Sequence, residues 1–221
     1  MQYVLITGAN RGLGLALVQH YGTRDDTHIF AACRNPDQAT ALNQLATTTK
    51  ARITPVRLDT TIPESIQSSL DAGILIPDPT ASDFGHLQPE PIRHTLEVNA
   101  IAPLMIIQAY GDLLKAAGQS AVINISSDAG SMALSRGCGS IAYRMSKAAL
   151  NMVTRCLSGT LTPYGVITIA IHPGWVQTDM GGTMAPLTPE ESASGMVQII
   201  DKLSPTDDGK FFDWKGDVMP W

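Results

Sequence analysis

Residues 3–14 limit the possible folds more than any other stretch of the chain. Residues 3–6 form a short apolar run of the kind found in buried parallel strands. TGANRGLG follows at 7–14, and the residues after it have helical spacing. Strand, glycine-rich turn and helix in this order are typical of dinucleotide binding, here in the G-x-x-x-G-x-G variant. We expect Gly8 to allow the tight turn, Gly12 the approach of a pyrophosphate, and Gly14 close packing of helix on sheet.

Apolar runs alternate with helical stretches along the rest of the chain. We predict strands at 28–33, 53–58, 121–125, 166–171 and 209–214, and helices at 88–114 with a bend at Pro103, 143–161 and 189–203. This alternation predicts an α/β fold with a doubly wound parallel sheet of the Rossmann type. The 221 residues contain no linker-like segment, so we predict a single domain spanning 1–221.

Composition excludes several kinds of partner. A net charge of −5 argues against nucleic acid or an anionic membrane. The longest apolar stretch, 100–107, is interrupted by Pro103, so we expect no membrane span. Three scattered cysteines and the lack of a signal-peptide pattern favour a cytoplasmic protein with reduced thiols. The five histidines show no metal-ligand spacing, so we expect no metal.

The end of the second predicted strand bears on cofactor choice. In NAD-binding sites an acidic residue at this position accepts from the ribose 2′-hydroxyl, whereas an arginine suits a 2′-phosphate. Here Arg34 follows the strand in place of an acidic residue, and Arg11 lies in the glycine-rich loop. Two guanidinium groups near one ribose favour NADP(H) over NAD(H).

A second group of residues suggests acid–base chemistry. Tyr143 and Lys147 are four residues apart on a predicted helix, which places them on one face. Free tyrosine titrates near pH ~10, and we expect the neighbouring ammonium to lower the pKa of Tyr143. Ser126 and Ser127 directly follow the strand predicted at 121–125. A hydroxyl there could hold a carbonyl or alcohol oxygen against the phenol, which is general acid–base chemistry on a carbon–oxygen bond.

Six motifs in order carry a family resemblance. They are TGANRGLG at 7–14, LD at 58–59, VNAIAP at 98–103, INISS at 123–127, YRMSK at 143–147 and HPGWVQTDM at 172–180. Together they resemble the short-chain dehydrogenase/reductase family over nearly the whole chain. Four segments are most similar in sequence to the C-factor and sniffer-like carbonyl reductase branch. They are ACRNP, YRMSKAALN, PGWVQTDMGG and GKFFDW.

The resemblance implies a role for individual residues. Tyr143 would be the general acid or base, Lys147 would lower its pKa and bind the nicotinamide ribose, and Asn99 would complete a proton relay through water. Ser127 is preferred over Ser126 as the substrate-orienting serine, although its sixteen-residue interval to Tyr143 is longer than the common pattern. The other implied cofactor-binding residues are Gly8, Asn10, Arg11, Gly12, Leu13, Gly14, Arg34, Asp59, Ala72, Gly73, Pro173, Gly174, Val176 and Thr178.

The resemblance implies an NADPH-dependent oxidoreductase that interconverts a small carbonyl compound and its alcohol. A non-catalytic or weakly active NADP-binding regulator of the C-factor type is the alternative, and a paralogue without cofactor is a third. Some family members pair through the helices near 90–115 and 143–161 while others are monomers, so a homodimer is compatible with the sequence.

One expected segment is shortened. The family has a complete helix and the fourth, central strand before an Asn-Asn-Ala-Gly motif, which here reads Leu70-Asp71-Ala72-Gly73. Only twelve residues separate Asp59 from Ala72, too few for a helix of ~11 residues and a strand of ~5–6. We expect residues 74–76 to enter the empty position as a short strand beside residues 4–6. The alternatives are direct closure of strands one and five, or a truncated isoform or faulty gene model that folds poorly. In each case we expect weaker cofactor binding and turnover.

Overall fold

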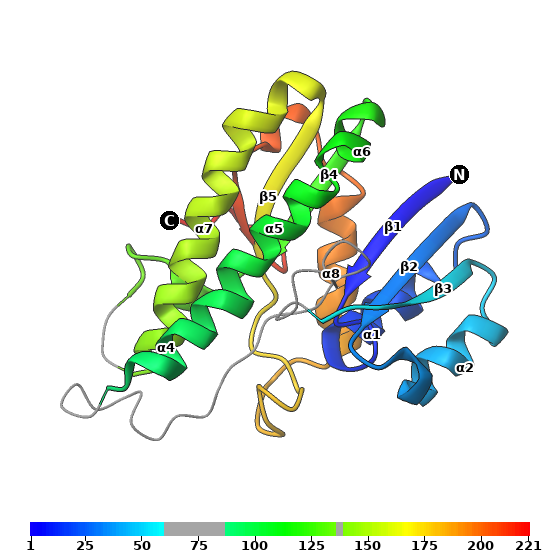
Figure 1. Ribbon diagram of the computed structural model, residues 1–221, viewed down its shortest axis with the longest axis horizontal. Coiled ribbons are helices and arrows are strands. Elements are labelled where there is room, and N and C mark those ends of the chain that lie inside the picture. The colour runs from blue at the N-terminus through cyan, green and yellow to red at the C-terminus, as the bar shows by residue number, and fades with distance from the viewer. Residues whose placement is uncertain (60–86, 136–138) are drawn as a thin grey trace. The chain divides into compact units, whose positions relative to one another are not determined.

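The computed structural model describes residues 1–59, 87–135 and 139–221 (Figure 1). The described residues fall into two units. The first lies within Met1–Gly73 and Trp175–Val197, and the second within Ile74–Gly174 and Gln198–Trp221. Each unit contains its own parallel sheet, and the two are described separately.

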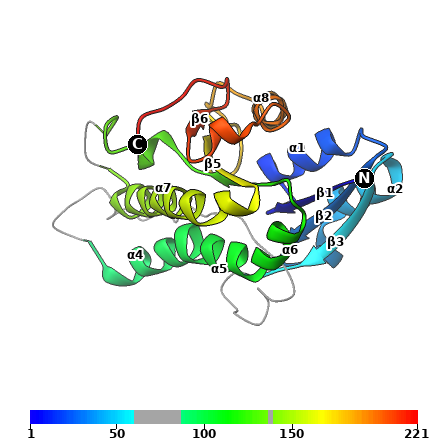
Figure 2. The ribbon, with the colours of Figure 1, turned by 90° about the horizontal axis from the view of Figure 1, so that it is seen from above.

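The first unit is built on the strands β1 (Gln2–Thr7), β2 (Thr27–Cys33) and β3 (Arg52–Arg57), which pair in parallel in that order. The helices α1 (Gly12–Tyr21) and α2 (Thr40–Thr48) cover one face of this sheet, α1 being clearest in Figure 2. The 3-10 turn η1 (Pro36–Gln38) precedes α2. The core of this unit includes Ile6, Val18, Ile29, Leu42, Ile53 and Val197.

The second unit is built on β4 (Ser120–Ile125), β5 (Val166–His172) and β6 (Phe211–Asp213), again parallel and in that order. The helix α7 (Ile141–Leu161) packs on β5. The helices α4 (Pro89–Leu96) and α5 (Ala102–Ala109) run beside α7 in both ribbon views (Figures 1 and 2). Ile107, Val122, Leu161 and Val166 form a buried apolar cluster between these helices and the sheet.

The short elements of the second unit lie at strand and helix ends. They are α6 (Gly111–Ala116), η4 (Asp128–Gly130), η5 (Thr162–Tyr164) and η6 (Pro205–Asp207). The helix α8 (Pro189–Ile200) spans the boundary between the units, and its Val197 belongs to the core of the first.

The helix predicted at 88–114 is interrupted. Between α4 and α5 lies a π-helical segment, η3 (Glu97–Ile101). Pro103 has no N–H, so the carbonyl of Asn99, four residues earlier, cannot accept the usual α-helical bond, and the widened turn accommodates this. A second interruption at Tyr110, where ψ is 4°, separates α5 from α6. The predicted bend therefore falls just before Pro103, and the break at Tyr110 was not predicted.

The predicted strands agree with the structure to within a few residues, because most of them are rich in β-branched or aromatic side chains. The six described strands form two three-stranded sheets, one in each unit. The expected short strand at residues 74–76 lies outside the described residues, as do Ala72 and Gly73.

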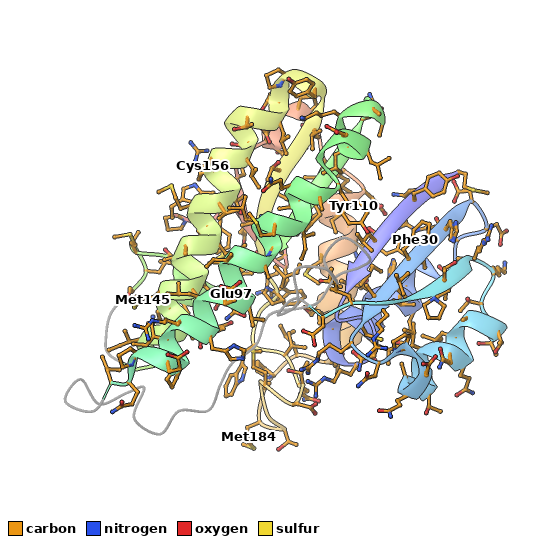
Figure 3. The ribbon with its side chains drawn as sticks, in the orientation of Figure 1. Phe30, Glu97, Tyr110, Met145, Cys156 and Met184 are labelled. Atoms are coloured by element: carbon orange, nitrogen blue, oxygen red, sulfur yellow. The ribbon has the colours of Figure 1, made fainter. Side chains whose placement is uncertain are left out.

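Within the described residues, no helix is both long and apolar enough to cross a membrane. Some apolar side chains are nevertheless exposed. Figure 3 shows Met145 and Cys156 projecting outward from α7, and Met184 at the tip of the loop between β5 and α8.

Candidate active site

The glycine-rich loop of the first unit has the backbone expected of a phosphate-binding turn. Gly8 and Gly12 adopt φ angles of 61° and 51°, in the left-handed region that favours glycine. A Cβ on Gly14 would lie 2.2 Å from the carbonyl oxygen of Gly8, so no side chain fits there. The helix α1 begins at Gly12, so its free N–H groups and positive dipole end lie at the loop. This loop can accept an anion.

Two arginines lie near the carboxyl ends of the strands in this unit. Arg11 precedes α1 and forms an exposed ion pair with Asp179, with 2.5 Å between Nη1 and Oδ2. Arg34 follows β2 and is exposed, and the half-buried Asp59 follows β3. Parallel strands place these two residues at the same edge as the glycine-rich loop. Asn10 and Leu13 lie within the loop and the first turn of α1.

The segment after β5 approaches the glycine-rich loop within the first unit. A Cβ on Gly12 would lie 3.3 Å from Cγ2 of Thr178. Thr178 also accepts a hydrogen bond from the backbone N–H of Gly181 at 3.1 Å, so its hydroxyl shapes the local turn. Val176 is buried and pairs with Leu187 across the loop. Pro173 and Gly174 directly follow β5 and belong to the second unit.

In the second unit, Tyr143 and Lys147 lie one turn apart on α7. The Nζ atom of Lys147 is 5.7 Å from the centre of the Tyr143 ring and donates a hydrogen bond of 2.9 Å to the carbonyl of Ile125, at the end of β4. The lysine is only 6% exposed. Burial lowers its pKa from 10.5 to about 8, because removal from water disfavours the ammonium.

The two serines after β4 have different surroundings. Ser126 is buried, and its hydroxyl donates to Oδ1 of Asn151 at 2.5 Å. Ser127 donates to Oδ1 of Asp128 at 3.0 Å and accepts from the backbone N–H of Ala129 at 3.1 Å. A hydrogen bond also connects the side chains of Ser127 and Tyr143. Of the two serines, Ser127 is therefore the one whose hydroxyl meets the phenol.

The pKa of Tyr143 lies above its ordinary value. Burial is the largest cause, a hydrogen bond between the side chains of Ser127 and Tyr143 lowers the pKa, and the charge of Asp128 raises it. The expectation that Lys147 would bring the pKa of Tyr143 below that of a free tyrosine is therefore wrong for this structure. The ammonium lies over the ring at 5.7 Å from its centre, but burial of the phenol has the larger effect on its pKa.

Asn99 lies in the π-helical segment and is almost completely buried. Its side-chain N–H donates to the hydroxyl of Ser146 at 3.0 Å, and that hydroxyl donates to the carbonyl of Tyr143 at 2.8 Å. The amide thus holds the turn of α7 that carries the tyrosine. π-Helical turns inside α-helices are frequent at functional sites.

A model of the short chain dehydrogenase family matches residues 2–186. The chain belongs to this family. C-signal of Myxococcus xanthus is 44% identical over 130 residues, which are 59% of this chain and 78% of the relative. This supports the resemblance to the C-factor branch within an oxidoreductase family.

Solved structures of carbonyl reductases are similar to this short-chain dehydrogenase over its whole length. The carbonyl reductase Sniffer of D. melanogaster is 33% identical, with a TM-score of 0.92 and full coverage of both chains. An NADPH-bound carbonyl reductase from chicken fatty liver is 37% identical, with a TM-score of 0.89 and coverage of 100% of this chain and 99% of that one. The Rossmann-type α/β fold predicted from the sequence is confirmed.

Two residues that support the site of this short-chain dehydrogenase were not predicted. Asn151 lies two turns after Tyr143 and binds both Ser126 and the carbonyl of Gly130, the latter at 3.2 Å. Gly130 lies so close to α7 that a Cβ would be 2.7 Å from the carbonyl carbon of Lys147. The polar series 143, 147, 151 on one helix face was the available signal for Asn151. Nothing local marks Gly130, because its neighbour is distant in the sequence.

Proposed function

We propose that this short-chain dehydrogenase is an NADP(H)-dependent carbonyl reductase, which reduces a small carbonyl compound to an alcohol or catalyses the reverse reaction. The observation that carries the proposal is the cluster in the second unit, where Tyr143 meets the Ser127 hydroxyl one helical turn from the buried Lys147. Buried titratable groups are costly in stability, so such a cluster favours a catalytic role. The carbonyl reductase structures support the substrate class.

The residues present fit a dinucleotide with a 2′-phosphate. Gly14 leaves no room for a side chain, Gly8 and Gly12 have positive φ angles, and the N-terminus of α1 is open to a phosphate. Arg34 occupies the position after β2 at which NAD-specific proteins have an acidic residue, and Arg11 adds a second guanidinium. The residues that would hold the cofactor are Gly8, Asn10, Arg11, Gly12, Leu13, Gly14, Arg34, Asp59, Ala72, Gly73, Tyr143, Lys147, Pro173, Gly174, Val176 and Thr178. When bound, the nicotinamide supplies the hydride.

The protein's own groups would handle the oxygen and the proton. Ser127 would donate its hydroxyl hydrogen to the carbonyl oxygen and orient it. Tyr143 would transfer its phenolic proton to that oxygen as the carbonyl becomes an alcohol, and the phenolate would recover a proton from solvent by the relay assigned to Asn99. A raised pKa keeps Tyr143 protonated at neutral pH, which suits proton donation and hence the reductive direction.

The raised pKa leaves a role for Lys147 that differs from simple acidification of the phenol. With a pKa of about 8, its side chain is mainly charged at pH 7. The positive charge would stabilise the phenolate that forms once Tyr143 has given up its proton. The hydrogen bond from Nζ to the Ile125 carbonyl fixes the ammonium beside the strand end that carries both serines.

The test is NADPH oxidation against a panel of small aldehydes, ketones and diketones. Tyr143→Phe should reduce turnover of any accepted substrate by at least ~10²-fold, the lower range for a positioned acid–base group. Tyr164→Phe is the matched control, because Tyr164 is half exposed and contacts Lys115 at the far end of α7. Near-normal turnover by Tyr143→Phe would show that the acid is another group.

A second candidate is a non-catalytic or weakly active NADP-binding regulator, favoured by the 44% identity with C-signal. Tyr143→Phe separates the two functions, because a regulator would keep its cellular effect while a reductase would lose turnover. Enhancement of NADPH fluorescence on binding would separate both from a paralogue that binds no cofactor.

A further inference from the structure

Next to the Ser127–Tyr143 pair lies a carboxylate–imidazole pair that the proposed reaction does not use. Asp128 follows Ser127 directly, and His172 is the last residue of β5. Oδ1 of Asp128 lies 3.9 Å from Nδ1 of His172, within ion-pair range but too far for a hydrogen bond. The histidine side chain is 18% exposed and the aspartate side chain 60%. The imidazole is therefore the more buried partner, while Oδ1 of Asp128 also accepts from the backbone N–H of Ala129 at 2.8 Å.

The Nδ1 atom of His172 is buried and, within the described residues, has no hydrogen-bond partner. An uncharged imidazole can leave this nitrogen as an unpaired acceptor, which is costly in a buried position. A protonated imidazole carries N–H on both nitrogens, and its Nδ1 then becomes a donor on the side of Asp128. Protonation of His172 therefore allows its Nδ1 atom to donate a hydrogen bond toward Asp128, which the neutral ring need not do.

The same carboxylate oxygen of Asp128 also binds the hydroxyl of Ser127, at 3.0 Å. A serine hydroxyl has one hydrogen, so a hydrogen given to Asp128 is not available to a substrate oxygen or to the Tyr143 oxygen. The negative charge of Asp128 also opposes ionisation of Tyr143. Asp128 therefore acts on both residues that would contact the substrate oxygen.

The charged and titratable groups around the pair come from three elements. Burial lowers the pKa of His172, and the charges of Asp128 on η4 and of Asp213, its register partner on β6, oppose this by favouring the imidazolium. Asp213 is held by the backbone N–H groups of Lys215 and Asp217, each at 2.9 Å. Tyr143 and Lys147 face the serine side from α7.

We propose that Asp128 and His172 form a proton-responsive positioning pair that controls the hydroxyl hydrogen of Ser127. While His172 is neutral, Asp128 holds that hydrogen. When His172 gains a proton, the imidazolium attracts the Asp128 carboxylate and the Ser127 hydrogen becomes available to the carbonyl oxygen. This proposal rests on the proposed reductase function for its kinetic consequence. Reduction should therefore become more efficient as the pH falls through the titration of His172.

The kinetic test compares pH profiles of kcat/KM for carbonyl reduction by the full chain with NADPH. We expect the wild-type profile to show an inflection that disappears in His172→Gln and in Asp128→Asn. The expected amplitude is up to about fivefold, the size of one unit charge acting across ~4 Å of water. His94→Gln, an exposed position on α4, should keep the inflection. An inflection that survives in His172→Gln would overturn the proposal.

A second measurement does not depend on turnover. In carbon-13-labelled histidine spectra, the His172 signal, assigned by its loss in His172→Gln, should titrate at lower pH in Asp128→Asn than in wild type. In carbon-13-labelled tyrosine spectra, the Tyr143 signal is assigned by its loss in Tyr143→Phe. It should show that the phenol ionises at lower pH in Asp128→Asn than in wild type. An unchanged His172 midpoint or an unchanged Tyr143 midpoint would overturn the pair. If both midpoints shift while no carbonyl is reduced, the pair stands and the reductase function fails.

Discussion

At the scale of single residues, the two arginines that favour NADP(H) are not equivalent. Arg11 lies in the glycine-rich loop and forms an ion pair with Asp179. Arg34 occupies the strand-end position that decides between the two dinucleotides. Cofactor preference should therefore respond most directly to a change at Arg34.

We predict that Arg34→Asp shifts the preference from NADP(H) toward NAD(H). A charge-assisted hydrogen bond contributes ~1.5–3 kcal/mol, so the ratio of the two affinities should change by about tenfold or more. Titration of each dinucleotide by fluorescence measures the ratio. Arg52→Asp makes the same charge change at the opposite end of the sheet and should leave the ratio unaltered. A wild-type protein that binds NAD(H) at least as tightly as NADP(H) would contradict the assignment.

Lys147 shows how a reactive group reduces stability. Its pKa in the folded chain is about 8, against 10.5 for an ordinary lysine. Below pH 8 both the folded and the unfolded chain bind the proton, and the folded chain bears the full cost of the buried charge. Between about pH 8 and 10.5 the folded chain releases the proton first, so stability rises with pH.

We therefore predict that the unfolding free energy of wild type, relative to Lys147→Met, increases by up to about 3 kcal/mol from pH 7 to pH 10.5. Denaturant unfolding of both proteins across this range measures the difference. Lys202→Met, at an exposed position, should show no such trend against wild type. A constant difference between wild type and Lys147→Met would mean that Lys147 titrates normally in the folded state.

At the scale of elements, the contact between η4 and α7 positions the serine against the tyrosine and lysine. Gly130 makes this contact possible, because its backbone lies directly on the backbone of Lys147. The amide of Asn151 joins the same two elements through the Gly130 carbonyl. The segment carrying Ser127 is thus fixed to the helix by a close approach and a hydrogen bond.

We predict that Gly130→Ala lowers stability by roughly 1–3 kcal/mol, as overpacking does, and reduces turnover by moving Ser127 away from α7. Gly159→Ala on the same helix has no neighbour within 4 Å of the new Cβ and should raise stability by roughly 0.5–1 kcal/mol. Thermal unfolding and NADPH oxidation of both variants provide the comparison. Full activity in Gly130→Ala would show that the contact does not position the serine.

These elements also show what the sequence could and could not reveal. The strands were predictable because runs such as VITIAI are apolar and β-branched, and α7 because its buried positions recur with helical spacing. The short helix α2, rich in threonine and alanine, gave only a weak apolar pattern. Within the candidate site, Tyr143, Lys147 and Ser127 follow from motif and resemblance. The raised pKa of Tyr143 and the approach of His172 to Asp128 depend on tertiary burial that no local pattern encodes.

At the scale of the whole molecule, the shortened stretch after Asp59 is the main departure from the family pattern. The described strands form β1-β2-β3 and β4-β5-β6, each a three-stranded parallel sheet. In the family pattern a fourth strand lies beside strand one, and the Ala-Gly backbone after it flanks the cofactor. The twelve residues between Asp59 and Ala72 are fewer than a typical helix and strand together require.

Our last prediction is that restoring this stretch strengthens the protein. In a chimera, residues 60–86 would be replaced by the corresponding segment of the chicken carbonyl reductase. A complete central strand from that segment is expected to pair its backbone with β1, and paired backbone groups favour the folded state. We expect a higher melting temperature, tighter NADPH binding and faster carbonyl reduction than in the original chain. Exchange of residues 179–188 for their counterpart is the control and should not raise the melting temperature. Equal melting temperatures and equal NADPH affinities for chimera and original chain would show that the shortened stretch costs the protein neither stability nor cofactor binding.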